Sequence, residues 1–136
     1  AVNLASRLEG QTKEYGVTLI VGESVAINSE ELFDFVELDF VAVKGKTEGV
    51  RIYTIAGEKH TEKGADVFKI RSLKHQRYLN FYRSQDWDLA IEVSDELQIE
   101  WPELSEFYRL MNERIEVLRI ESLPRNWDGV YRATSK

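Results

Sequence analysis

The first residues of the chain place an amide and a guanidinium at a spacing that suits one shared ligand. Asn3 and Arg7 are four positions apart, so on a helix they share a face, with Cβ atoms about 6 Å apart. Apolar residues at roughly helical spacing, followed by the stop signal Gly16, predict that helix from about Ala1 to Tyr15. By spacing alone the pair has two interpretations: two groups aimed at one ligand, or two solvated side chains on a helix surface.

A lysine-bearing turn is the second place where chemistry is expected. The segment KGKTEG, which contains Lys44 and Lys46, separates an alternating apolar run that begins at Val36 from the run Val50–Ile55. This pattern predicts a β-hairpin. The string GKT also suggests a phosphate-binding P-loop, but that motif requires glycine where Phe40 stands and a helix where a strand is predicted. We therefore exclude a P-loop.

Shorter elements are predicted between the first helix and the hairpin. Val17–Val21 is a β-branched run bounded by glycines, typical of a strand buried on both faces. Glu23–Asn28 suits a brief helix. In the hairpin, alternation predicts Val36, Leu38, Phe40 and Ala42 on one side of the strand, with Glu37 and Asp39 on the other. A charged stretch is predicted to form a solvated face: Glu30, Glu31, Asp34, Glu37 and Asp39.

Beyond residue 57 the apolar period becomes helical. The polar, glycine-bracketed segment GEKHTEKG predicts a linker, which we place at 58–66. It separates residues 1–57 from a helical tail over 67–122 and an irregular segment over 123–136. Pro102 suits the start of the third tail helix. The three expected helices carry Leu73, Tyr78, Leu79, Phe81 and Tyr82; Trp87, Ala90, Ile91 and Val93; and Leu104, Phe107, Tyr108, Met111, Ile115 and Leu118.

Composition excludes several classes of protein. The 136 residues suffice for one domain or slightly more, and 43% hydrophobic residues support a packed core. A net charge of −6 has the wrong sign for a nucleic-acid binder, and the chain has no cysteine for disulfides, thiolate zinc sites or thiol nucleophiles. No apolar run is long enough to span a membrane, so we expect no membrane contact by this segment.

Other residues that could bind a metal or act as a nucleophile lack the neighbouring residues that such a site requires. His60 and His75 lack a companion ligand at metal-binding spacing, and we expect both at the surface. Ser24 lacks the flanking glycines of a nucleophile elbow. The three tryptophans, Trp87, Trp101 and Trp127, are interpreted as packing residues, and Trp127, Val130 and Tyr131 are expected to dock on the helices.

Three strings in order give a resemblance to a known family. AVNLASRLE, VTLIV and ELDFVAVKGKTEGVRIYTI resemble the C-terminal half of a class III adenylate/guanylate cyclase catalytic domain, over residues 1 to about 56. The resemblance implies an α+β fold with a partial ferredoxin-like sheet of about three strands and a flanking helix, followed here by an all-helical tail. It also implies conversion of a nucleoside triphosphate, ATP before GTP, to the 3′,5′-cyclic nucleotide and pyrophosphate.

The resemblance assigns a role to each candidate residue. Asn3 would orient the ribose, and Arg7 would neutralise charge that develops on the α-phosphate. Lys44 would contact the polyphosphate, with Lys46 as the weaker candidate. In this family two aspartates of the first half of the domain bind Mg2+ or Mn2+, and no such half precedes Ala1. We therefore expect an excised or truncated segment that is inactive alone, with no metal ligands of its own.

Association and location follow from the same resemblance. Class III sites form between two subunits, and a segment of about 57 residues would expose sheet edges, so we expect a homodimer or a domain-swapped assembly. Tyr82, Asp86, Trp87 and Ala90, with Pro102 beyond them, resemble a degenerate tetratricopeptide helix pair. The string RNWDGVY is similar to the end of bacterial membrane-anchored cyclases with a CHASE2 sensor. We expect a cytoplasmic segment, either free or part of such an anchored protein.

Two other functions remain open at this point. The helical tail could make the chain a noncatalytic protein-interaction module, with the cyclase-like part as a scaffold. Alternatively, the chain could be a phosphate-binding regulatory domain, whose affinity for ATP would depend on Lys44.

Overall fold

Short elements form the first part of the molecule and three longer helices form the second. The computed structural model describes residues 11–42, 49–58 and 62–132. Antiparallel strands followed by a helical C-terminal portion confirm the predicted α+β class. In chain order the elements are α2 (Thr12–Tyr15), β1 (Val21–Gly22), α3 (Glu23–Asn28), β2 (Phe33–Ala42), β3 (Gly49–Glu58), α4 (Glu62–Arg83), α5 (Trp87–Glu100), the 3-10 helix η1 (Pro102–Leu104) and α6 (Ser105–Glu121).

The predicted hairpin is confirmed as the centre of the sheet. Strands β2 and β3 pair antiparallel, with Phe40 opposite Arg51 and Ala42 opposite Gly49. The turn between them lies outside the described residues. The sheet order is β1-β3-β2, so β3 is the central strand and β2 is an edge strand among the described elements.

Strand β2 departs from the predicted alternation in its middle. It begins at Phe33, earlier than predicted, and its register with β3 shifts between Glu37 and Asp39. A β-bulge of this kind inserts one residue and re-aims the side chains beyond it. Leu38 and Asp39 are therefore both fully buried, whereas the alternating pattern had placed them on opposite sides.

The prediction for the first strand was wrong in extent and in burial. Only Val21 and Gly22 pair with β3, and both are half-buried at the edge of the sheet. Upstream, Gly16 adopts a left-handed conformation at φ 68° and ends α2. A Cβ at Gly16 would lie 2.5 Å from Cγ of Glu106 on α6, so the chain passes close to that helix before it reaches the sheet. Tertiary packing thus overrides the strand preference of residues 17–20.

The predicted solvated acidic face is wrong for three of its members. Glu30 and Glu31 are exposed, but Asp34 and Asp39 are buried. The side chain of Glu37 is only 13% exposed and pairs with two arginines. Because a buried carboxylate needs a counter-charge or hydrogen bonds, these residues indicate internal polar contacts that the local pattern did not reveal.

The three tail helices are confirmed, with two local corrections. Helix α4 begins at Glu62, inside the predicted linker, and η1 at Pro102 introduces α6. Leu73, predicted to face the core, is 61% exposed, whereas Tyr78, Leu79 and Tyr82 are fully buried. The division into a cyclase-like segment and a separate tail is not tested by the fold and stays a prediction.

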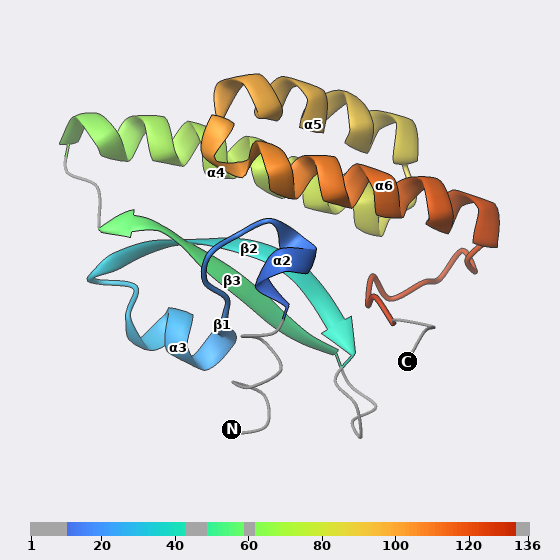
Figure 1. Cartoon of the computed structure of the whole chain (residues 1–136), viewed down its shortest axis with the longest axis horizontal. Helices are drawn as coiled ribbons and strands as arrows, with labels where there is room; N and C mark the ends of the chain where they lie inside the picture. The colour runs from blue at the N-terminus through green and yellow to red at the C-terminus, as the bar shows by residue number, and fades with distance from the viewer. Residues whose placement is uncertain (1–10, 43–48, 59–61, 133–136) are drawn as a thin grey trace.

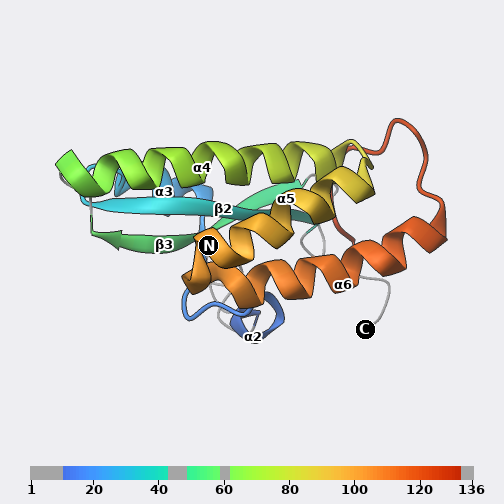
Figure 2. The same cartoon turned by 90° about the horizontal axis from the view of Figure 1, so that it is seen from above.

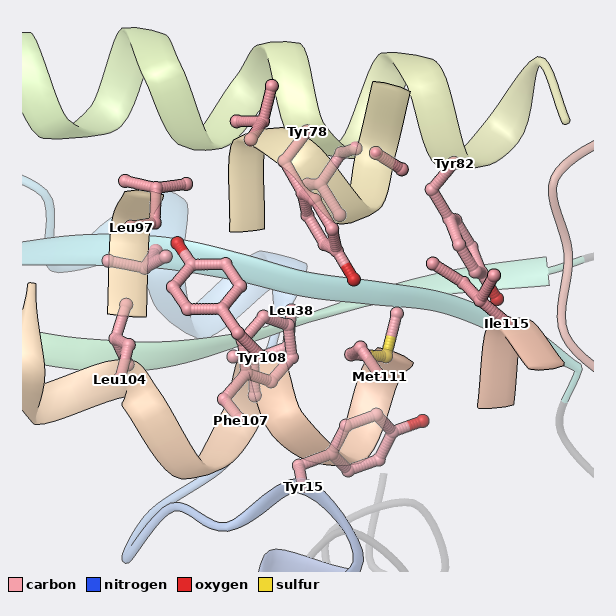
Figure 3. Packing of buried hydrophobic residues seen from close by; sticks show 14 of the residues in the cluster. Tyr15, Leu38, Tyr78, Tyr82, Leu97, Leu104, Phe107, Tyr108, Met111 and Ile115 are labelled. Atoms are coloured by element: carbon pink, nitrogen blue, oxygen red, sulfur yellow. The ribbon is translucent and has the colours of Figure 1, made fainter. Parts of the chain in front are cut away.

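The helices and the sheet share one hydrophobic core. Figure 1 shows α4, α5 and α6 together over one face of the sheet, with α3 on the other side. Seen from above in Figure 2, α4 and α6 run along the two sides of this layer and α2 lies against α6. Figure 3 shows Leu38 of β2 among Tyr108, Met111 and Phe107 of α6. Side chains from residues 15–52 and 78–118 thus belong to a single buried cluster.

The C-terminal segment lies against the sheet edge and the helices, as predicted for Trp127, Val130 and Tyr131. The Tyr131 amide donates to the Phe40 carbonyl at 2.8 Å, and the Ala42 amide donates to the Tyr131 carbonyl at 3.0 Å. Val130 is buried, and Trp127 packs edge-on against Tyr82. This segment therefore covers part of the exposed edge of β2.

Candidate functional site

The three residues assigned to the nucleotide lie outside the described part of the chain. Asn3 and Arg7 precede α2, which begins at Thr12, and Lys44 follows the end of β2. The structure therefore does not test their mutual geometry, and their roles stay predictions. What it does describe is the set of elements to which these residues are attached.

A buried ion pair anchors α2. Asp39 of β2 is fully buried, and its Oδ2 accepts from Nη1 of Arg114 on α6 at 2.5 Å. The same oxygen accepts from the Tyr15 hydroxyl, on the last residue of α2, at 2.7 Å. Arg114 also donates to the Tyr82 hydroxyl on α4 at 3.2 Å, and its guanidinium lies 3.6 Å from the ring centre of Tyr131. One ion pair thus connects four elements with the C-terminal segment.

Burial and charge shift the titration of the hydroxyls in this cluster. Burial, and then the negative charge of Asp39, raise the pKa of Tyr15 far above its ordinary value. The pKa of Tyr82 rises for the same two reasons. Both phenols therefore stay protonated at neutral pH and act as hydrogen-bond donors or acceptors, not as bases.

A second charged cluster lies near the hairpin end of the sheet. Oε2 of Glu37 accepts from Arg51 at 2.8 Å and from Arg83, at the end of α4, at 2.7 Å. Both guanidinium groups also lie near the ring of Phe40, at 4.7 and 5.9 Å. Two arginines share one carboxylate, so the cluster retains positive charge two strand positions beyond Gly49. The sequence patterns had not singled out these cations.

The prediction that His75 lies at the surface is wrong; His60 lies outside the described residues. His75 is 3% exposed between α4, α6 and β2. Its Nε2 lies 2.5 Å from the Glu37 carbonyl and its Nδ1 lies 2.6 Å from the Tyr108 hydroxyl. A carbonyl only accepts, so Nε2 carries the proton and Nδ1 accepts from Tyr108. Burial lowers the pKa of His75 to about 4, which keeps the ring neutral at pH 7.

We expect His75 to make the stability of the chain depend on pH. Its pKa falls from 6.5 to about 4 on folding, so the unfolded chain binds more protons between these values. Stability from this group is complete above pH 6.5 and decreases as the pH falls, by about 3 kcal/mol at pH 4. Urea unfolding of the native chain and of His75→Gln at several pH values measures this pH dependence of the unfolding free energy.

The comparison isolates the imidazole because every carboxylate is common to both chains. Gln does not titrate, and its amide can still donate to the Glu37 carbonyl. The difference in unfolding free energy between the two chains should shrink from pH 7 to pH 4. Parallel pH profiles would contradict a buried, neutral His75.

One hollow lies away from the hairpin end of the sheet. A cavity of about 480 Å3 opens between the chain after α2, the later part of β3, the start of α4 and η1. Arg71 lies over the ring of Trp101 at one wall, and Glu103 contributes a carboxylate. The position of Thr54–Ala56 in the wall puts this cavity toward the end of β3 farther from Gly49.

Metal ligands were not expected in this segment. Within residues 11–42, 49–58 and 62–132, no group of three or more His, Cys, Asp or Glu side chains is arranged to hold an ion. Asp39, whose side chain is fully buried, forms an ion pair with Arg114. In the same ranges, no helix has the length and apolar character needed to cross a bilayer.

Comparison with known proteins relates part of the chain to adenylate cyclases. Over 58 residues the chain is 47% identical to an adenylate cyclase of Anabaena cylindrica. This match covers 40% of the chain and 12% of that protein. Over 56 residues the chain is 34% identical to Adenylate cyclase 1 of Rhizobium meliloti (strain 1021). This second match covers 41% of the chain and 8% of the relative. No family model and no solved structure matches. The chain thus spans about a tenth of the length of these curated relatives, and the relationship extends over about two fifths of its own.

Sequence reasoning missed the residues that organise the buried network. Two signals were present. Asp39 interrupts the apolar string LDFVAV, and Arg114 directly precedes the core residue Ile115, close to the apolar face of its helix. A charged residue at such a position indicates a buried partner of opposite charge. The sequence does not show, however, that Asp39 and Arg114 are each other's partners.

Proposed function

We propose that this chain is a C-terminal part of the catalytic domain of a class III adenylate cyclase. The reaction is attack of the ribose 3′-hydroxyl of ATP on the α-phosphorus, which forms the cyclic 3′,5′ ester and breaks the bond to pyrophosphate. The observation that carries the proposal is the 47% identity over 58 residues to a protein named adenylate cyclase. The ordered blocks that contain Asn3, Arg7 and Lys44 support it.

Each residue has a distinct part in this proposal. The Asn3 amide orients the ribose, and the Arg7 guanidinium stabilises the negative charge that develops on the α-phosphate. Lys44 neutralises the polyphosphate. Mg2+ or Mn2+, bound by aspartates of the other half of the domain, supplies activation of the hydroxyl and charge neutralisation. GTP in place of ATP is the alternative substrate.

The wider context of the chain belongs to the same proposal. We expect a homodimer, with Asn3 and Arg7 of one subunit facing the metal-binding aspartates of the other. The tail over 67–122 is a tetratricopeptide-like unit of a CHASE2-type bacterial cyclase, and the segment is cytoplasmic. Binding of a partner protein by the tail is the competing function; the experiment below separates it from catalysis.

Complementation is the decisive test. The 136-residue chain alone should form no cyclic AMP with Mg2+ or Mn2+. Addition of a polypeptide that carries the metal-binding half of the domain should restore activity. In that assembly Arg7→Ala should lower kcat by about 100- to 1,000-fold, and Asn3→Ala should also lower it, because each removes a group aimed at the transition state. Cyclic AMP formation is measured against Lys13→Ala, an exposed cation of α2.

The outcomes discriminate between the proposals. Metal-dependent activity of the chain alone would contradict the requirement for a second half. A folded, stable assembly without activity would favour the interaction module. ATP binding by the chain alone that is lost in Lys44→Ala, measured by calorimetry, would indicate a regulatory phosphate site instead.

A further inference from the structure

The hollow beside Arg71 and Trp101 has the size of a small-molecule site. Its volume is about 480 Å3, and ligand pockets typically measure about 300 to 1,000 Å3. Space is left there because Gly16, Ala56 and Gly64, which line it, carry a single methyl group or no side chain. In Figure 1 the end of β3 and the start of α4, which form two of its sides, lie at the same end of the molecule.

One wall of the hollow is aromatic and held in place. The rings of Phe68 and Trp101 meet edge-on, with their centres 6.0 Å apart. Trp101 is 5% exposed and also packs edge-on against buried His75. The Leu104 amide, in the same wall, donates to the Trp101 carbonyl at 2.9 Å. The wall is therefore preformed, so a ligand does not have to order these side chains in order to bind.

A cation without an ionic partner lies at this wall. The Arg71 guanidinium is 5.7 Å from the centre of the Trp101 ring. No carboxylate in the part of the chain that the structure describes forms an ion pair with it, whereas Lys74, on the same helix, pairs with both Glu96 and Glu100. A guanidinium that rests on an aromatic ring and faces a hollow is suited to the head group of an anion.

We propose that this hollow binds a small amphipathic carboxylate, a molecule with one carboxylate head and an aromatic or aliphatic body. Arg71 donates to the carboxylate, and the body lies against the rings of Phe68 and Trp101, where its apolar surface leaves water. Glu103 also lines the hollow, and its negative charge repels a phosphate dianion more than a carboxylate monoanion. The residues involved are separate from those assigned to the cyclase reaction, so the inference does not depend on the proposed function.

Titration of the full chain with phenylacetate, followed by proton–nitrogen NMR, tests the site. The indole signal of Trp101 should shift saturably, because its ring forms the wall. Trp87 and Trp127 pack against Tyr82, near the other end of α4, so their indole signals should not move. Neutral phenylacetamide should bind about 10-fold more weakly, because it lacks the charge that strengthens the hydrogen bonds from Arg71.

Three variants identify the groups that bind. Arg71→Met removes the cation and should weaken phenylacetate binding about 10-fold. Arg77→Met is the matched control, since Arg77 lies over the ring of Phe81 at 5.9 Å on the same helix and is not in the wall of the hollow; it should change the affinity less than about twofold. Ala56→Leu places a larger side chain in the hollow and should abolish binding. Urea unfolding shows whether each variant is folded.

Each outcome supports or overturns the proposal. A saturable Trp101 shift that is weakened by Arg71→Met and retained in Arg77→Met supports it. The proposal is wrong if no saturable shift occurs up to about 10 mM phenylacetate, if the acid and the amide bind equally, or if folded Ala56→Leu binds with native affinity. Tighter binding of phenyl phosphate than of phenylacetate would overturn the assignment of a carboxylate ligand.

Discussion

Asp39→Asn should destabilise the chain by about 3 to 5 kcal/mol, because it leaves the Arg114 guanidinium buried without a counter-charge. Asp39 is 0% exposed and Arg114 10%, so water does not replace the lost carboxylate. The Tyr15 hydroxyl loses its charged acceptor in the same change. Urea unfolding at pH 7 measures the effect.

A matched pair and a double variant make this prediction specific. Asp88 and Arg119 form the same kind of ion pair at 3.0 Å, but Asp88 is 94% exposed, so Asp88→Asn should change stability by less than about 0.5 kcal/mol. Asp39→Leu combined with Arg114→Met should cost much less than the sum of the single changes, because no charge stays buried. Equal effects of Asp39→Asn and Asp88→Asn would refute a buried pair.

Leu38→Ala should destabilise the chain by about 3 to 5 kcal/mol, since it opens a cavity between the sheet and α6. Leu38 is 0% exposed and lies in the cluster that joins β2 to the tail helices. The surrounding rings of Phe107 and Tyr108 are held by other contacts, so the space does not close readily. Chemical denaturation followed by tryptophan fluorescence measures the loss.

Leu32→Ala is the control for this change. Leu32 directly precedes β2 and is 66% exposed, so its truncation should cost less than about 0.5 kcal/mol. The contrast tests whether the sheet and the tail fold as one unit. A loss below about 1 kcal/mol for Leu38→Ala would mean that the helices do not cover this face of the sheet.

Local patterns predicted elements better than they predicted burial. The glycine after Tyr15, the alternation before Ala42 and the helical periods of the tail each describe short-range geometry. The hairpin strands and the tail helices are present, and of the first predicted helix the structure describes only Thr12–Tyr15, which ends at that glycine. The bulge after Glu37 is not a local property, and neither is the failure of residues 17–20 to pair with β3. They depend on contacts with the neighbouring strand and with α6. Because a single sequence does not reveal these contacts, its patterns assigned Asp39 and His75 to the surface.

The candidate site divides in the same way. Asn3, Arg7 and Lys44 came from motif spacing and family resemblance and stay predictions, because they lie outside the described residues. Arg114 and Tyr15 came only from the structure, since 99 positions separate them in the chain. No local period relates residues so far apart.

By itself, the sequence determined the class of fold, the order of helices and strands, and the relationship to adenylate cyclases over part of its length, because propensity, periodicity and motif identity are all short-range properties. The tertiary structure decided which charges are buried and which elements hold one another. The physical reason is that desolvation of Asp39, Arg114 and His75 arises only when segments distant in sequence exclude water from a common core.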